Sequence, residues 1–312
     1  MTTLRDRSFL RLLDFTPEEL RLLLDRSHEV KAERRRGERP RRFEGCSLAM
    51  LFEKRSTRTR AAFETAFGEE GGHPVFLSSQ DIQLGAKETV EDTARVLGRM
   101  FDLIEFRGFR QETVDQLARH ADVPVINGLT DSWHPTQALA DLMTMEEEFG
   151  RLRGLTTAFV GDGRNNVSNS LLVSAALMGL NHTIYCPEEL RPDPEVLRVA
   201  ETLAAGSGAS LGVVSDPATM PASTEVVYTD VWVSMGEEAQ AAERLSLLKP
   251  FQVNAAMLDR LPDAMFLHCL PAVRGNEMTA EVIDGKRSRV FDQAENRKHT
   301  IKAIMLELLG VD

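Results

Sequence analysis

The chain has 312 residues, of which 42% are hydrophobic and 27% are charged, and its formal net charge is −11 at pH 7. A chain longer than roughly 250 residues usually divides its core, so two domains are predicted. The negative charge argues against a nucleic-acid partner, which requires a concentrated positive face. No apolar stretch has the length of a membrane span, so no membrane partner is expected.

The three cysteines, Cys46, Cys186 and Cys269, have neither the spacing of a metal site nor the number needed for a disulfide framework. The sequence therefore implies no structural metal. The first residues, Met-Thr-Thr-Leu-Arg-Asp-Arg, lack the apolar core of a signal peptide. Together these features predict a protein of the reducing cytoplasm.

Strand and helix patterns alternate along the chain. Strands are predicted at 47–52, 74–77, 102–106, 123–126, 156–160, 182–186, 211–214, 225–229, 264–268 and 288–291. Helices are predicted at 16–31, 58–69, 88–100, 111–120, 135–149, 167–178 and about 295–309. Such alternation is typical of parallel sheets in an α/β architecture, and two series linked by helix 135–149 predict two sheets flanked by helices.

A polar turn, Ser56-Thr57-Arg58-Thr59-Arg60, follows the first strand and begins a helix. Free backbone N–H groups and the positive end of the helix dipole attract anions there, and arginines add bidentate donors. The turn lacks the glycine-lysine signature of a nucleotide loop, which favours a small phosphorylated substrate over ATP. The alternative is an ordinary capped helix with surface arginines.

Ligands of open parallel sheets bind at the carboxyl ends of strands. By that rule Arg107, which follows the strand at 102–106, joins the Ser56–Arg60 turn. His134 follows the strand at 123–126, and it shares one helical face with Gln137. Taken alone, a histidine at a helix start is more often a cap or a packed surface group.

The second half carries fewer decisive signals. The turn Gly161-Asp-Gly-Arg-Asn-Asn166 has Asn166 where a dinucleotide-binding turn requires its third glycine, which argues against a nicotinamide cofactor. Asp230 ends a strand and suits a substrate ammonium group, and the loop Ser234-Met235-Gly236 suits a lid. Cys269 is either a small buried hydrophobe or a site residue. Arg297, expected in the first turn of the last helix, would need an acid or a ligand to hold it there.

Together these segments closely resemble the aspartate/ornithine carbamoyltransferase family. The segments that carry the resemblance are Ser56-Thr-Arg-Thr-Arg60, Gln83-Leu-Gly-Ala-Lys-Glu88, Asp92-Thr-Ala-Arg95, Phe106-Arg107-Gly108 and His134-Pro-Thr-Gln137. The second half is similar to the ornithine branch, through Asn165-Asn166, Asp230, Ser234-Met-Gly236, His268-Cys-Leu-Pro271 and Glu295-Asn-Arg297. An aspartate enzyme would have the run His-Pro-Leu-Pro where this chain has His268-Cys269-Leu270-Pro271, so the expected second substrate is ornithine.

The resemblance also implies roles and domain limits. It implies a carbamoyl-phosphate-binding domain at 1–148 and an ornithine-binding domain at 149–312, whose last helix, at about 295–310, returns to the first. Phosphate would be held by Ser56, Thr57, Arg58 and Thr59, and the carbamoyl end by Arg107, His134 and Gln137. Gln83 would enter a neighbouring subunit's site in a trimer. Ornithine would be bound by Asn166, Asp230, Ser234 and Met235, and the two substrates would meet at Cys269, Leu270 and Arg297.

The implied reaction transfers the carbamoyl group of carbamoyl phosphate to the δ-amine of L-ornithine. It forms no covalent intermediate and uses no cofactor and no metal, since the substrate already carries a good leaving group. Arg107, His134, Cys269 and Arg297 are the expected catalytic residues. The alternatives are transfer to N-acetylornithine or putrescine, and a non-catalytic sensor of carbamoyl phosphate or an amino acid. The sequence leaves open whether citrulline is made for synthesis or for degradation.

Overall fold

The computed structural model describes residues 3–79, 88–233 and 238–312. The chain divides into two compact units, Met1–Met143 with Glu295–Asp312, and Thr144–Ala294. Each unit contains a parallel sheet flanked by helices, so the predicted fold class is confirmed. The last helix, α11 (Val290–Leu309), contributes most of its length to the first unit, also as predicted.

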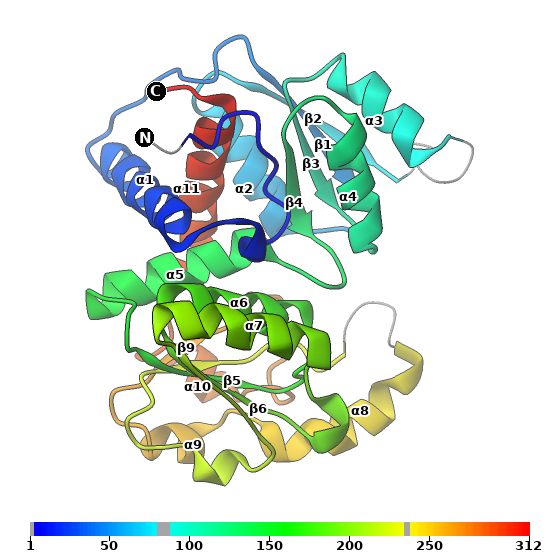
Figure 1. The fold of residues 1–312 in the computed structure, drawn as a ribbon. Helices are drawn as coiled ribbons and strands as arrows, with labels where there is room; N and C mark the ends of the chain where they lie inside the picture. Colours follow the sequence, from blue (N-terminus) through cyan, green and yellow to red (C-terminus); the bar gives the residue numbers. More distant parts are fainter. Residues whose placement is uncertain (1–2, 80–87, 234–237) are drawn as a thin grey trace. The chain divides into compact units, whose positions relative to one another are not determined.

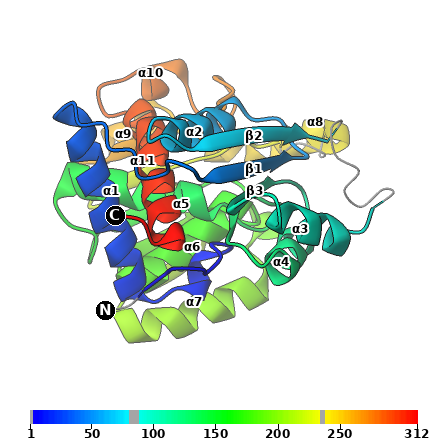
Figure 2. The ribbon, with the colours of Figure 1, turned by 90° about the horizontal axis from the view of Figure 1, so that it is seen from above.

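The first unit is built on a sheet with the order β2-β1-β3-β4, in which all pairs are parallel. Its strands are β1 (Ser47–Phe52), β2 (His73–Ser78), β3 (Leu103–Arg107) and β4 (Val125–Leu129). Its helices include α1 (Pro17–Arg35), α2 (Thr57–Gly68), α3 (Val90–Gly98), α4 (Gln111–His120) and the start of α5 (Pro135–Phe149). Figures 1 and 2 show α3 and α4 on one face of the sheet and α1, α2 and α11 on the other.

The two faces of β3 explain how this unit separates its core from its polar chemistry. Ile104 and Phe106 pack against apolar residues of α3 and α4. Because successive side chains of a strand point to opposite faces, Glu105 and Arg107 face the side of α2 and α11. Arg107 accordingly reaches Thr59 of α2. Strand β3 thus contributes apolar side chains to the core on one face of the sheet and charged side chains to the opposite face.

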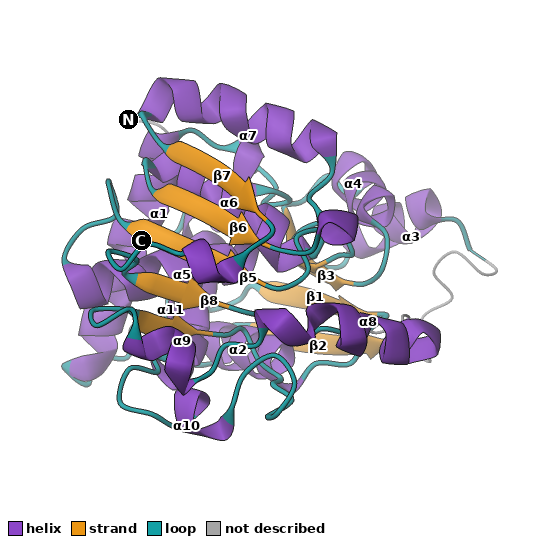
Figure 3. Cartoon of the chain, turned by 90° about the horizontal axis from the view of Figure 1, so that it is seen from below, coloured by secondary structure: helices purple, strands orange, loops and turns teal. Residues whose placement is uncertain are grey.

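The second unit is built on a parallel sheet with the order β7-β6-β5-β8-β9, drawn in orange in Figure 3. Its strands are β5 (Thr156–Val160), β6 (Asn181–Tyr185), β7 (Ser210–Val214), β8 (Val226–Tyr228) and β9 (Met265–Leu267). Its helices include α6 (Asn166–Met178), α7 (Pro194–Ser207), α8 (Ala241–Leu248), α9 (Ala255–Asp259) and α10 (Ala280–Ile283). Val160, Val227 and Phe266 pack with residues of α9 and α10 in one core cluster.

Both sheets have a point where the strand order reverses. In the first unit it lies between β1 and β3, whose last residues, Phe52 and Arg107, are neighbours in the register. In the second unit it lies between β5 and β8. Open α/β sheets bind ligands at the carboxyl ends of the two strands that flank such a point. The topology therefore assigns one candidate ligand site to each unit.

One predicted strand was wrong. At 288–291 only Ser288 forms a bridge, to Phe266, and α11 begins at Val290. The backbone N–H of Gln293 already donates to the carbonyl of Arg289 at 2.8 Å, so the helix takes over directly after the bridge. Arg297 consequently lies two turns inside α11. The dipole penalty that a first-turn cation would suffer does not apply to it.

Candidate functional site

The start of α2 is a capped helix end at the reversal point of the first sheet. The hydroxyl of Ser56 accepts a hydrogen bond from the backbone N–H of Thr59 at 3.2 Å. The apolar face of this helix includes Phe63 and Phe67, both fully buried, and it fixes the helix on the sheet. Thr57 is exposed and Arg58 is half-buried, so polar groups of this turn are accessible at the helix start.

Two arginines from distant parts of the chain converge on one hydroxyl. Arg107 Nη1 lies 3.1 Å from Thr59 Oγ1, and Arg297 Nη2 lies 3.0 Å from the same oxygen. Arg107 is 8% exposed and Arg297 is 3% exposed. Two largely desolvated cations around a neutral oxygen repel each other, and a polyanion at the same place would relieve that repulsion. This geometry favours a phosphate-bearing ligand.

His134, immediately before α5, belongs to the same basic cluster. It is buried, and burial lowers its pKa well below the ordinary value of 6.5, with further lowering by Arg297, Arg107 and Arg58. The imidazole is therefore neutral at physiological pH and can donate one hydrogen bond without adding positive charge.

Gln137 follows one turn later, and its amide Nε2 donates to Asp141 Oδ1 at 2.8 Å. This contact orients the amide, because a carboxylate accepts but does not donate. The carbonyl Oε1 of Gln137 is buried and has no hydrogen-bond partner among the described residues. Such an acceptor suits the NH₂ group of a ligand. Asp141 itself was not predicted, since only its helical i, i+4 spacing from Gln137 could have indicated it.

The second unit presents a carboxylate held from two sides. Asn165 Nδ2 donates to Asp230 Oδ2 at 2.7 Å, and Cys269 Sγ donates to Asp230 Oδ1 at 3.1 Å. Asn165 also caps α6 through Oδ1, which accepts from the backbone N–H groups of Val167 and Ser168. The sequence analysis assigned Asn166 to ornithine and gave Asn165 no role of its own, although asparagine at a helix cap is a strong signal. Asn166 is the first residue of α6.

The loop after β9 is fixed by hydrogen bonds of His268. Its Nδ1 accepts from the backbone N–H of Leu270 at 2.8 Å, and its Nε2 lies 3.2 Å from Glu277 Oε1. Leu270 has a φ of 57°, a left-handed conformation that is unusual for a bulky residue and that this contact supports. Asp230, His268 and Cys269 are close enough to hold a cation. Both nitrogens of His268 are already engaged, however, so this donor set does not fit a metal ion.

The structure separates Arg60 from the other arginines expected around the anion. Arg60 is exposed, its Nε lies 2.9 Å from Glu64 Oε1, and its guanidinium stacks over the ring of Phe76. Three predicted site residues, Gln83, Ser234 and Met235, lie outside the described residues. The structure also brings Glu105, which was not predicted, within electrostatic reach of Arg107 and Arg297. Its place between the apolar residues Ile104 and Phe106 gave no sign of a ligand site.

Two family models match this chain and together cover most of its length. Residues 7–147 match the family model described as "Aspartate/ornithine carbamoyltransferase, carbamoyl-P binding domain", and residues 153–308 match "Aspartate/ornithine carbamoyltransferase, Asp/Orn binding domain". The chain belongs to the aspartate/ornithine carbamoyltransferase family. The resemblance found from sequence motifs is thereby confirmed.

Several members of the carbamoyltransferase family are similar over nearly their full length. An ornithine carbamoyltransferase of Caldanaerobacter subterraneus subsp. tengcongensis is 59% identical over 98% of both chains. A catabolic ornithine carbamoyltransferase of Bacillus licheniformis is 50% identical over 98% of this chain and 97% of its own. The solved structure of the Pyrococcus furiosus ornithine carbamoyltransferase is 46% identical over 99% of both chains, with a TM-score of 0.96. Among the described residues, no helix is both long and apolar enough to cross a membrane.

Proposed function

We infer that this chain is an enzyme that transfers the carbamoyl group of carbamoyl phosphate to the δ-amine of L-ornithine, giving L-citrulline and phosphate. The observation that supports carbamoyl phosphate as the donor is the convergence of Arg107 and Arg297 on Thr59 at the capped start of α2. Ornithine as the acceptor is supported by Asp230 with Cys269, and by full-length similarity to proteins named ornithine carbamoyltransferase.

On the first unit, the phosphate group is bound by Ser56, Thr57, Arg58 and Thr59. The backbone N–H groups and hydroxyls at the start of α2 supply directed donors, and the helix dipole adds a favourable field. Arg107 and Arg297 can donate to phosphate oxygens while they keep their contacts with Thr59. These charge-assisted bonds stabilise the phosphate as it leaves.

The carbamoyl end of the substrate is bound by both hydrogen-bond donors and a hydrogen-bond acceptor. Arg107 and the neutral His134 donate toward the carbonyl oxygen, on which negative charge develops during attack. The buried Oε1 of Gln137 accepts from the carbamoyl NH₂ group. A ligand with an oxygen in place of that NH₂ would meet acceptor against acceptor, and binding it would be disfavoured.

On the second unit, Asp230 pairs with the α-ammonium of ornithine, while Asn166, Ser234 and Met235 contact its α-carboxylate side. Asn165 and Cys269 hold the two oxygens of Asp230, so the carboxylate is oriented before substrate arrives. Cys269, Leu270 and Arg297 are assigned to the place where the two substrates meet. Aspartate lacks an amine at the δ position, and putrescine and N-acetylornithine lack a free α-ammonium.

The chemistry is acyl transfer between two oriented substrates. The neutral δ-amine attacks the carbamoyl carbon, a C–N bond forms, and the tetrahedral intermediate expels phosphate as its C–O bond breaks. The departing phosphate accepts the proton that the amine loses. Arg107, His134 and Arg297 stabilise the charge that develops on oxygen, and orientation supplies much of the remaining rate enhancement.

Assembly, location and direction complete the proposal. We assign the chain to a homotrimer in which Gln83 enters a neighbouring subunit's site, and to the cytoplasm, where Cys46, Cys186 and Cys269 remain free thiols. The reaction is assigned to arginine biosynthesis. Relatives named without a qualifier reach 59% identity, whereas those named catabolic reach 50–52%, which supports the biosynthetic direction.

The test is an assay of purified protein with carbamoyl phosphate and, in separate reactions, ornithine, N-acetylornithine, putrescine and aspartate. Ureido product and phosphate are both measured. Citrulline formed only with ornithine is the expected result, and Asp230→Asn should raise the KM for ornithine while leaving carbamoyl phosphate binding intact in calorimetry. Preference for another amine would overturn the assignment of Asp230, and binding without turnover would indicate a sensor.

A further inference from the structure

The first unit contains a buried carboxyl group that the proposed reaction does not use. Glu105, in the middle of β3, is fully buried, and neither of its carboxyl oxygens has a hydrogen-bond partner among the described residues. Burying a carboxylate without partners is costly, so such a group needs an electrostatic reason to be there.

The fold makes space for this carboxyl group. The register between β3 and β4 shifts after Phe106, which pairs with Asn127, so that Arg107 pairs with Leu129 and Gly128 is left over in the bulge. A Cβ atom added at Gly128 would lie 2.0 Å from Oε1 of Glu105. The carboxyl group therefore occupies the volume that any other residue at 128 would fill.

The charges that act on Glu105 come from the substrate-binding arginines. Glu105 and Arg107 are two residues apart on the same face of β3, and Arg297 reaches this face from α11. The neighbours of Glu105 in the strand register, Met50 on β1 and Ile126 on β4, are apolar. Beyond them, the basic cluster continues with His134 and Arg58, and that histidine is neutral.

We propose that Glu105 is a positioning residue that buffers the charge of the carbamoyl phosphate site. In the empty site a partly ionised carboxyl group offsets the repulsion between Arg107 and Arg297. When the dianionic phosphate binds in front of the two guanidinium groups, Glu105 takes up a proton from solvent and becomes neutral. The proposal rests on the proposed function only in taking carbamoyl phosphate as the ligand.

The balance of fields on Glu105 agrees with this exchange. Burial raises the pKa of Glu105 well above its usual value of 4.5, while Arg107 and Arg297 act in the opposite direction. A phosphate dianion beside the arginines screens their fields and adds repulsion of its own, so the pKa of Glu105 rises further on binding. By linkage, binding weakens as the pH rises and Glu105 ionises in the empty site.

The experiment compares the wild type with Glu105→Gln, which keeps the shape and removes the titration. Isothermal titration calorimetry with carbamoyl phosphate between pH 6 and 9.5, in buffers of different ionisation enthalpy, gives the Kd and the number of protons taken up. At the acid end of this range the two proteins should bind equally. At the alkaline end the wild type should bind at least about fivefold more weakly than the variant, as expected for a buried like charge, and only the wild type should take up protons.

Two further variants make the result specific. Glu105→Met removes the charge and all hydrogen-bonding capacity and should reproduce Glu105→Gln. Glu64→Gln removes a carboxylate from α2 that solvent screens and should keep the pH profile of the wild type. Superimposable profiles of the wild type and Glu105→Gln, or disagreement between the Gln and Met variants, would overturn the proposal. Absence of any carbamoyl phosphate binding by the wild type at neutral pH would instead refute the proposed function.

Discussion

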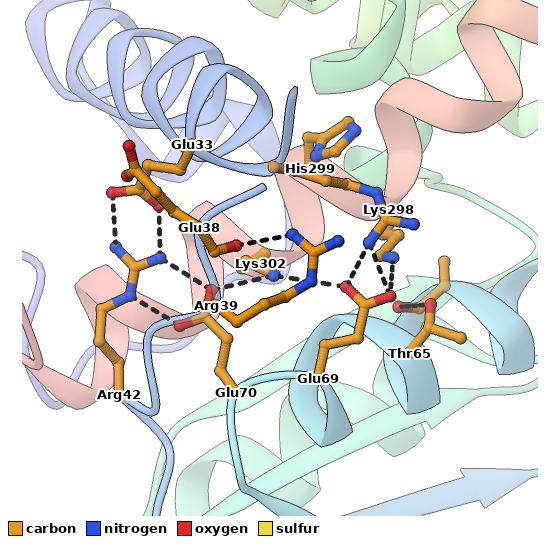
Figure 4. Close-up of polar contacts among 12 residues, drawn as sticks. Glu33, Glu38, Arg39, Arg42, Thr65, Glu69, Glu70, Lys298, His299 and Lys302 are labelled. Carbon is orange, nitrogen blue, oxygen red and sulfur yellow. Dashed lines mark hydrogen bonds and ion pairs between the residues drawn. The ribbon is translucent and has the colours of Figure 1, made fainter. Parts of the chain in front are cut away.

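The two ends of helix α2 carry dense charge but differ in how that charge is arranged. At the C-terminal end, Glu69 pairs with Lys298, and Glu70 pairs with Arg42 and Lys302 (Figure 4). Glu69 also pairs with Arg34. At the N-terminal end, Arg107 and Arg297 share the neutral hydroxyl of Thr59. The first arrangement matches acids with bases, whereas the second concentrates cations at a helix end that itself attracts anions.

Within one structural unit, this difference distinguishes a stabilising network of ion pairs from the cluster that we propose as the phosphate-binding site. In a network of matched and partly buried ion pairs, removing either partner lowers the free energy of unfolding. In a cluster of like charges the members repel one another, and a bound anion relieves that repulsion. The same helix, α11, supplies Arg297 to one end of α2 and Lys298 and Lys302 to the other, so variants on α11 can test each property separately.

The largest effect is expected from Arg297→Met. If this guanidinium stabilises the leaving phosphate as proposed, its loss should lower kcat/KM for carbamoyl phosphate by about a thousandfold. The melting temperature should stay equal or rise, since the repulsion with Arg107 is relieved. Steady-state kinetics and thermal denaturation of the same preparation provide the check, and a variant with normal turnover but a lowered melting temperature would show that the two ends had been assigned the wrong way round.

Lys302→Met should give the opposite pattern. Its ammonium group lies 2.9 Å from Glu70 Oε1, and both side chains are almost fully buried. Removing it leaves a buried carboxylate with one partner fewer, at a cost of about 3 kcal/mol in the free energy of unfolding. The value of kcat should change less than about twofold, since the group is remote from the developing charge.

A double variant sharpens this test. Adding Glu70→Gln to Lys302→Met should recover part of the lost stability, because the unpaired buried charge disappears. Recovery should be incomplete, since Arg42 then loses one of its two carboxylate partners. Chemical denaturation gives the coupling energy, and strictly additive losses would mean that Lys302 and Glu70 do not interact.

The local elements of this fold could be predicted from sequence far better than its long-range contacts. The spacing of apolar residues and the positions of turn residues predicted strands β1 and β3. The residue type of Ser56 predicted the helix cap. The stretch 288–291 was misread because Val290 and Phe291 favour strands, while the helical hydrogen bonds that begin at Arg289 override that preference.

Contacts between distant residues left no local signal. Arg297 and Thr59 are 238 positions apart, so neither spacing nor composition could show that they touch. Glu105 lies in the middle of a strand that is buried on both faces, between two residues that belong to the apolar core. Only the geometry of the folded unit places it behind the arginines. The sequence thus predicted the capped turn at the start of α2 but not the buried carboxyl group of Glu105.

The next expected effect concerns acid stability and His299, which adjoins the network in Figure 4. Burial lowers the pKa of His299 from 6.5 to about 4, although Glu295 acts in the opposite direction. Between pH 6.5 and 4 the unfolded chain binds the proton more readily than the folded one, so stability falls as the pH falls, by about 3 kcal/mol in total. His299→Gln should remove this contribution from urea denaturation curves recorded across that range. His73→Gln, at an exposed position, is the matched control. Equal slopes of stability against pH for the wild type and the two variants would contradict the assignment to His299.

The smallest effect is expected for Arg60→Ala, which tests whether position in the motif or burial decides function. Arg60 belongs to the same turn sequence as Arg58, yet it is exposed, pairs with Glu64 and stacks on Phe76. An exposed i, i+4 pair and a surface cation–π contact together contribute about 1 kcal/mol or less to stability. Turnover should therefore change less than about twofold, because a solvated charge outside the buried cluster contributes little to the field at the phosphate. Kinetics of Arg58→Ala and Arg60→Ala measured side by side decide the point. A comparable collapse in both would mean that the anion is bound by the whole basic turn, and the contrast between the two ends of α2 would then reflect charge density more than the geometry of its buried arginines.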